Sequence, residues 1–177
     1  MEIIDLEIPG LKLVKLKVHG DARGFFVERY KEGMLPNNFV QDNHSRSQPG
    51  IVRGLHYQRN PDQAKLVGCI RGRIYDVAVD IRKDSPTFGR HFGIDLTGEN
   101  GLMLFVPAGF AHGFSVLEES DVLYKVDGFY NPEGEGSIRF DDPEIGIDWR
   151  VDNPTVSERD QNSPNFEEYC KNPVFEY

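Results

Sequence analysis

Hydrophobic and polar residues alternate over short stretches along most of the chain, and turn-forming Gly, Pro, Asp and Asn interrupt these stretches. A period of two residues is typical of strands with one buried face, whereas the longer period of an amphipathic helix is nearly absent. The predicted strands lie near 12–18, 25–30, 39–45, 51–58, 64–71, 73–81, 91–96, 102–106, 113–117 and 122–129. This pattern predicts an all-β sandwich, jelly roll or barrel, because these architectures bury one face of each strand and expose few sheet edges.

The clearest tight turn of the chain is Arg71-Gly72. Glycine can adopt the positive φ that a hairpin needs, so the sequence predicts a hairpin between strands 64–71 and 73–81. Alternation along the second strand places Tyr75, Val77, Val79 and Ile81 on one face and Asp76, Ala78 and Asp80 on the other. We expect the first face to join the core and the second to face a cavity or water.

The length of 177 residues is sufficient for one hydrophobic core, and no linker, repeat or change in composition divides the chain. The sequence therefore predicts a single domain over residues 1–177. From Asn131 onward acidic loops replace the alternating pattern, and one helical turn is expected near 166–170. We expect this short C-terminal tail to pack across the sheet or against a partner subunit.

The chain carries a formal net charge of -9 at pH 7. This charge disfavours nucleic acid or an anionic membrane surface as partner, because long-range repulsion opposes the encounter. No apolar run reaches the roughly 18 residues that span a bilayer, and no signal peptide is visible. Cys69 and Cys170 lack metal-like spacing and are interpreted as free thiols of a cytoplasmic protein, although their spacing is also compatible with a disulfide.

The segment VRGLHYQ, residues 52–58, places charged side chains where a buried strand would favour apolar ones. His56 is the strongest candidate for chemistry, because an imidazole can take up and return a proton near neutral pH; the alternative is a half-exposed histidine bonded to a backbone carbonyl. Arg53 and Lys65 could stabilise negative charge on a substrate oxygen, or could be solvated cations at a strand edge. Arg53 and His56 have opposite parity, so a regular strand would place them on opposite faces. Both can reach one pocket only if the strand bulges, and Gly54 is the expected position of that bulge.

Three further side chains could complete a site, although each also has a structural interpretation. His112 could be a buried structural histidine, and Tyr124 and Tyr130 could anchor a core or an interface. The two tyrosines have the same parity, so their hydroxyls point to one side if the strand continues that far. The five histidines form no HxH pair, which weakens a metal site that needs three or four converging ligands. Without a Walker loop, GxGxxG or GxSxG, NTP hydrolysis, nicotinamide binding and serine hydrolase chemistry have no support.

Ordered motifs cover nearly the whole chain, from about Leu11 to Asp160. They are DARGFFVE (21–28), FVQDNHSRS (39–47), VRGLHYQ (52–58), QAKLV (63–67), DVAVDIRKDSPTFG (76–89), PAGFAHGF (107–114), and DDPEIGIDW (141–149) combined with SERD (157–160). Together they resemble the dTDP-4-dehydrorhamnose 3,5-epimerase family, a set of metal-independent cupin-type jelly rolls. The resemblance implies an all-β, cupin-type jelly roll with short helical segments and no cofactor. The sequence departs from the family at Arg150, where many members have proline, and the C-terminal NPVFEY has no role in these motifs.

The resemblance also implies roles for individual residues. His56 would be the general base, Asp160 its carboxylate partner and Tyr124 the proton donor on the opposite face, and Lys65 would lie near the C4 oxygen of the sugar. Further contacts with the nucleotide sugar would come from Arg23, Glu28, Gln41, Asn43, Arg53, His112, Tyr130, Glu135 and Arg159.

The implied reaction inverts C3 and C5 of dTDP-4-dehydro-6-deoxy-D-glucose through enolate intermediates to give dTDP-4-dehydro-L-rhamnose. A C3-only epimerase would share the same residues. A non-catalytic jelly roll that binds nucleotide sugars and a metal-dependent cupin are the alternatives from other classes. Family members are usually homodimers that exchange N-terminal strands, and the alternating segment LKLVKLKV is compatible with such an exchange.

Overall fold

The computed structural model describes residues 1–177 and consists mainly of strands. The strands are β1 (Glu2–Asp5), β2 (Lys12–Lys15), β3 (Val18–Asp21), β4 (Gly24–Val27), β5 (Gln41–Ser47), β6 (Val52–Gln58), β7 (Lys65–Asp80), β8 (Arg82–Lys83), β9 (His91–Thr97), β10 (Leu102–Val106), β11 (Phe110–Val126), β12 (Glu135–Ser137) and β13 (Phe175–Glu176). Two short helices, α1 (Glu158–Gln161) and α2 (Phe166–Lys171), lie near the C-terminus. The all-β prediction is confirmed, and α2 covers the predicted helical turn.

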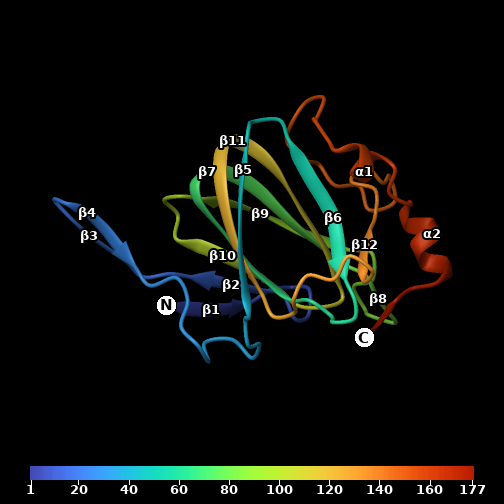
Figure 1. Cartoon of the computed structure of the whole chain (residues 1–177), viewed down its shortest axis with the longest axis horizontal. Helices are drawn as coiled ribbons and strands as arrows, with labels where there is room; N and C mark the ends of the chain where they lie inside the picture. Colours follow the sequence, from blue (N-terminus) through green and yellow to red (C-terminus); the bar gives the residue numbers. More distant parts are fainter.

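Two long antiparallel strands, β7 and β11, organise the fold and pair along most of their length. The first part of β7 also pairs with β10, whereas its second part pairs with β9. In the same way, β11 pairs with β6 near its start and with β5 near its end. The two halves of this long ribbon therefore belong to different layers of strands (Figure 1). This arrangement confirms the predicted jelly roll.

The hairpin predicted at Arg71-Gly72 is wrong. Gly72 has a φ of +76°, as a turn glycine would, but it lies inside β7, and both parts of this strand pair with β11. A Cβ added at Gly72 would lie 2.0 Å from the backbone oxygen of Glu119, so a side chain has no room there. The strands predicted at 113–117 and 122–129 are likewise one strand, β11, interrupted by register shifts. Local turn chemistry was recognised correctly, but the sequence did not show that the chain bends without reversing.

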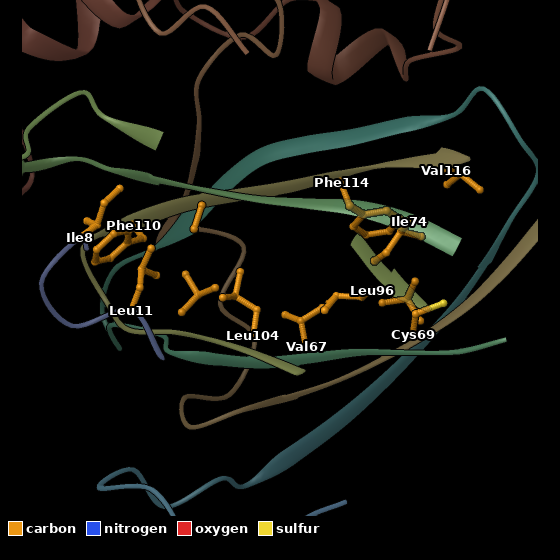
Figure 2. Close-up of a cluster of buried hydrophobic side chains, with 13 residues drawn as sticks. Ile8, Leu11, Val67, Cys69, Ile74, Leu96, Leu104, Phe110, Phe114 and Val116 are labelled. Atoms are coloured by element: carbon orange, nitrogen blue, oxygen red, sulfur yellow. The ribbon is translucent and has the colours of Figure 1, made fainter. Parts of the chain in front are cut away.

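The central core lies between the two layers of strands (Figure 2). Val67 and Cys69 from the first part of β7 and Ile74 and Ala78 from the second all belong to this one cluster. The inward-facing positions therefore change from odd to even numbers at Gly72. One irregular residue allows both parts of a long strand to face the same interior.

The prediction that Asp76, Ala78 and Asp80 face a cavity or water is wrong, because all three are fully buried. Ala78 packs in the central core. Asp80 pairs with Arg82 and accepts hydrogen bonds from the hydroxyls of Ser85 and Thr87 at 2.6 and 2.7 Å. The cause is that strands and loops cover both faces of this part of β7.

Each outer face of the sandwich is covered by a segment without long strands. The C-terminal segment contributes Trp149, Phe166, Tyr169 and Phe175 to a cluster with the outward side chains of β7. Residues 27–39 cover β2 and β10 in the other cluster. The C-terminal tail thus packs across the sheet, as predicted.

The hairpin of β3 and β4 extends away from the two layers (Figure 1). Its aromatic side chains Phe25 and Phe26 are 66% and 70% exposed. Both Cys69 and Cys170 are free, in agreement with the sequence interpretation. None of the helices has the length and apolar character needed to cross a membrane.

Candidate active site

A cavity of about 680 Å³ opens inside the sandwich, within the range of roughly 300–1,000 Å³ that is typical of small-molecule sites. Its walls come from β5, β6, β7, β11 and β12 and from the segment that enters α1. The cavity brings together all of the predicted site residues except two: Gln41, Asn43, Arg53, His56, Lys65, His112, Tyr124, Tyr130, Glu135, Arg159 and Asp160. Arg23 and Glu28 do not line it.

The half-exposed His56 and the buried Asp160 form a pair at the cavity wall. Nε2 of His56 lies 2.6 Å from Oδ1 of Asp160, and the backbone N–H of Gly54 donates to Oδ2 of the same carboxylate. Burial opposes ionisation of Asp160, but hydrogen bonds from His56 and Gly54 and the charge of His56 outweigh it and lower the pKa of this carboxyl. Ser157 caps α1 and accepts from the backbone N–H of Asp160, which fixes the carboxylate in place. With Nε2–H donated to Asp160, Nδ1 is the nitrogen left to accept a proton.

The irregularity expected at Gly54 is present. Gly54 has a φ of +123°, and the register of β6 against β11 shifts between His112 and Phe114. A Cβ at Gly54 would lie 2.6 Å from the Cα of Gly113, so the two strands approach too closely for a side chain. As a result Arg53 and His56 line the same cavity despite their opposite parity.

Lys65 supplies a partly buried cation at the start of β7. Its Nζ donates to the backbone oxygen of His56 at 3.3 Å, which ties the ammonium to the backbone of β6. Burial lowers the pKa of Lys65 to about 8, and the negative charges of Glu135 and Asp76 partly offset this effect. Lys65 is therefore mainly an ammonium at neutral pH.

Tyr124 extends from β11 into the cavity and is partly buried against the central core. Burial raises the pKa of its phenol, although the charge of Arg53 partly offsets the effect. The phenol therefore keeps its proton at neutral pH and can donate it. The expectation that one strand would carry both Tyr124 and Tyr130 is not met, because β11 ends at Val126 and Tyr130 lies in a loop. Both tyrosines nevertheless line the cavity.

Tyr130, Glu135 and Arg159 form a polar group at the cavity. The Tyr130 hydroxyl donates to Glu135 Oε2 at 3.0 Å, and Arg159 Nη1 lies 2.9 Å from the same oxygen. Burial opposes ionisation of Glu135, but Arg159 and Tyr130 together lower the pKa of its carboxyl. On the wall formed by β5, Gln41 Nε2 donates to Asn43 Oδ1 at 2.8 Å.

His112 forms a hydrogen bond with Asp76, a carboxylate that was not among the predicted site residues. Nε2 of His112 lies 2.9 Å from Oδ1 of Asp76, which is fully buried, while Oδ2 of Asp76 has no hydrogen-bond partner. His112 is also the register partner of His56, so the two imidazoles lie on neighbouring strands. Asp76 was recognised only as one of a row of polar strand positions, because its contact depends on the pairing of β7 with β11.

The two predicted site residues outside the cavity belong to the β3–β4 region. Arg23 is at the tip of the exposed hairpin, where it pairs with Asp21. Glu28 is exposed just after β4. Within one chain, these residues do not join the site.

The assembled groups provide a proton acceptor, a proton donor and fixed cations around one cavity. No cluster of three or more His, Cys, Asp or Glu side chains is arranged as metal ligands would be. The arrangement can remove a proton from carbon next to a carbonyl, stabilise the resulting oxyanion and return a proton.

A family model described as dTDP-4-dehydrorhamnose 3,5-epimerase matches residues 5–168. The chain belongs to this family. A dTDP-4-dehydrorhamnose 3,5-epimerase of Shigella flexneri is 47% identical over 174 residues, which cover 94% of this chain and 96% of that protein. The resemblance drawn from the motifs is thereby confirmed.

Solved structures of this epimerase family and its relatives have the same fold. A dTDP-6-deoxy-D-glucose-3,5-epimerase of Legionella pneumophila, in complex with dTDP-4-keto-L-rhamnose, is 42% identical, with a TM-score of 0.95 and coverage of 99% of this chain and 98% of that chain. A 3'-monoepimerase of Streptomyces bikiniensis in complex with dTDP-quinovose is 31% identical, with a TM-score of 0.90 and coverage of 98% and 92%. The fold alone therefore does not separate one inversion from two.

Proposed function

We propose that this chain inverts C3 and C5 of dTDP-4-dehydro-6-deoxy-D-glucose and so produces dTDP-4-dehydro-L-rhamnose. The His56–Asp160 pair, which shares one cavity with Tyr124 and Lys65, is the observation that carries this proposal. Two inversions are favoured over one because identity is 47% to a 3,5-epimerase and only 31% to a 3'-monoepimerase.

In the proposed mechanism, Nδ1 of neutral His56 removes the proton from C3 or C5. Both carbons flank the C4 carbonyl, so either deprotonation gives an enolate with its negative charge mainly on the C4 oxygen. Asp160 holds the imidazole and stabilises the imidazolium that forms. Lys65 and Arg53 stabilise the oxyanion, and a well-placed donor of this kind contributes about 3–4 kcal/mol to the transition state. Tyr124 then donates its proton to the opposite face of the carbon, which completes the inversion.

Incubation with dTDP-4-dehydro-6-deoxy-D-glucose in deuterated water, followed by NMR, tests this function. The expected product is dTDP-4-dehydro-L-rhamnose with deuterium at both C3 and C5. Deuterium and inversion at C3 alone would identify a monoepimerase. Binding without exchange at either carbon would identify a non-catalytic sugar-binding protein.

The partly buried ammonium of Lys65 predicts an alkaline limit to activity. Its pKa of about 8 means that the charged form is present below this pH and is lost as the pH rises through it. We expect kcat/KM to fall above pH 8, and the Lys65→Arg variant, if active, to shift this limb upward because guanidinium stays protonated. Lys125→Arg is the control, since Lys125 pairs with Asp42 and does not line the cavity. If the alkaline fall in kcat/KM occurs at the same pH in Lys65→Arg as in the wild type, another group must cause it.

We also propose that the chain acts as a cytoplasmic homodimer of single-domain subunits. The exposed Phe25 and Phe26 on the projecting hairpin support this proposal, because a second copy could bury them and receive Arg23 and Glu28 at its cavity. The free cysteines fit a reducing compartment. Sedimentation equilibrium should give twice the 20.2 kDa of one chain, and cell fractionation should recover the protein with cytoplasmic markers.

A further inference from the structure

Gln58 is a buried polar residue at the end of β6, with an exposed fraction of only 4%. All hydrogen bonds of its side chain are to backbone atoms of two loops. Its Nε2 donates to the carbonyl oxygens of Pro61 and Phe129, each at 3.0 Å, and its Oε1 accepts from the N–H of Asn131 at 2.9 Å. Phe129 and Asn131 flank Tyr130, so one amide fixes the backbone on both sides of a residue that lines the cavity.

The two loops that Gln58 joins are also bound directly to each other. Loop 59–64 follows β6, and loop 127–134 connects β11 to β12. Their contacts are Gln63 Nε2 to the oxygen of Gly128 at 2.8 Å, the N–H of Ala64 to Asp127 Oδ1 at 2.6 Å, Asn131 Nδ2 to the oxygen of Asn60 at 2.6 Å and the N–H of Arg59 to the oxygen of Gly134 at 2.8 Å. A Cβ at Gly134 would lie 1.7 Å from the oxygen of Arg59, which shows how closely the loops approach. The pair therefore forms one double-loop wall of the cavity.

Tyr130 is the side chain that this double-loop wall presents to the cavity. It is 57% exposed, and within the chain its phenol is held only by the Glu135 and Arg159 group. Its backbone N–H donates weakly to Gln41 Oε1 on β5, at 3.4 Å. Because the side chain itself has little packing, its position depends on the backbone on either side of it, which Gln58 fixes.

We propose that Gln58 is a positioning residue that holds Tyr130 in place for the bound nucleotide sugar. This inference rests on the proposed function for the identity of the ligand. Gln58 lines the cavity, but its side chain makes no hydrogen bond to the groups proposed to transfer protons, so we expect its effect on binding rather than on proton transfer. An apolar residue of the same size would fill the space but leave three backbone groups without their partner.

The test compares Gln58→Met, Gln58→Glu and the wild type by KM, kcat, the Kd of dTDP from calorimetry and thermal unfolding. Gln58→Met should raise KM and the Kd of dTDP about tenfold, with kcat changed by less than about twofold. Gln58→Glu retains the shape and an acceptor but loses both amide donors, and should show the same selective effect if Gln58→Met does not fold. Ser115→Ala is the matched control, because the buried Ser115 hydroxyl donates to the oxygen of Trp149 away from the cavity. It should reduce stability and leave KM unchanged.

A double variant separates positioning from general stability. In a Tyr130→Ala background, Gln58→Met should add less than about twofold to the Kd of dTDP, because the residue that it positions is gone. An unchanged Kd in the single variants, or the same tenfold increase in the Tyr130→Ala background, would overturn the proposal. If the wild type binds dTDP but does not turn over the sugar, the proposed reaction fails, while the binding measurements still judge the role of Gln58.

Discussion

Replacing His56 with alanine is expected to lower kcat by roughly 10³- to 10⁴-fold, which is the upper part of the range for general acid–base catalysis. The reason is that both deprotonations depend on the same imidazole, so neither C3 nor C5 exchanges its proton without it. The side chain is still 28% exposed, and the buried Asp160 keeps its bonds from Gly54 and to Ser157. The variant should therefore fold. NMR in deuterated water should show no incorporation at either carbon on the time scale of wild-type turnover.

His44 provides a matched control for this variant. Its Nε2 lies 2.9 Å from Asp121, so it forms a histidine–aspartate pair like that of His56, but it lies outside the cavity. His44→Ala should retain wild-type turnover within about twofold. His56→Asn adds a second variant that keeps a polar group beside Asp160 and should be as inactive as His56→Ala. Wild-type exchange in either His56 variant would remove His56 from the mechanism.

Replacing Tyr124 with phenylalanine should separate proton removal from inversion. The variant retains the ring that packs against the core and loses only the hydroxyl. Inversion should fall about 10²- to 10⁴-fold, the effect of removing a general acid. His56 can still remove a proton and return a deuteron to the same face, so we expect deuterium at C3 of recovered substrate without the corresponding product.

Tyr169→Phe is the control for loss of a buried phenol. The Tyr169 hydroxyl donates to the oxygen of Ile81 at 2.7 Å in the cluster behind the site, where it has no access to the cavity. This variant should lose stability while keeping the ratio of inversion to exchange. If Tyr124→Phe inverts both centres at the wild-type rate, another group must be the proton donor.

The sequence predicted most strands because alternation and turn residues are local properties. It failed at Gly72 because a glycine with positive φ is compatible with both a reversal and a bend. The pairing of β7 with β11 along both of its parts decides between them, and this pairing joins residues far apart in the chain. The same limitation hid the full burial of Asp76, which depends on the layers that cover β7.

The candidate site was predicted more fully than the topology, because the motifs identify residues whatever the path of the chain between them. Arg53 and His56 were both expected at the site although they have opposite parity, and this conflict indicated the irregularity that the structure has at Gly54. Gln58 was not among the predicted site residues, since a buried amide bonded to loop backbone has no sequence signature of its own. Arg23 and Glu28 show the opposite limit, because a single chain does not bring them to the cavity.

The bend in β7 at Gly72 has a consequence for the arrangement of charges at the candidate site. Lys65 lies before Gly72 on this strand and Asp76, which supports His112, lies after it. The angle of this bend therefore affects how far the Lys65 ammonium lies from the buried carboxylate of Asp76, whose negative charge raises the pKa of Lys65. A glycine outside the cavity wall thus helps to determine the charge state of a cation inside it.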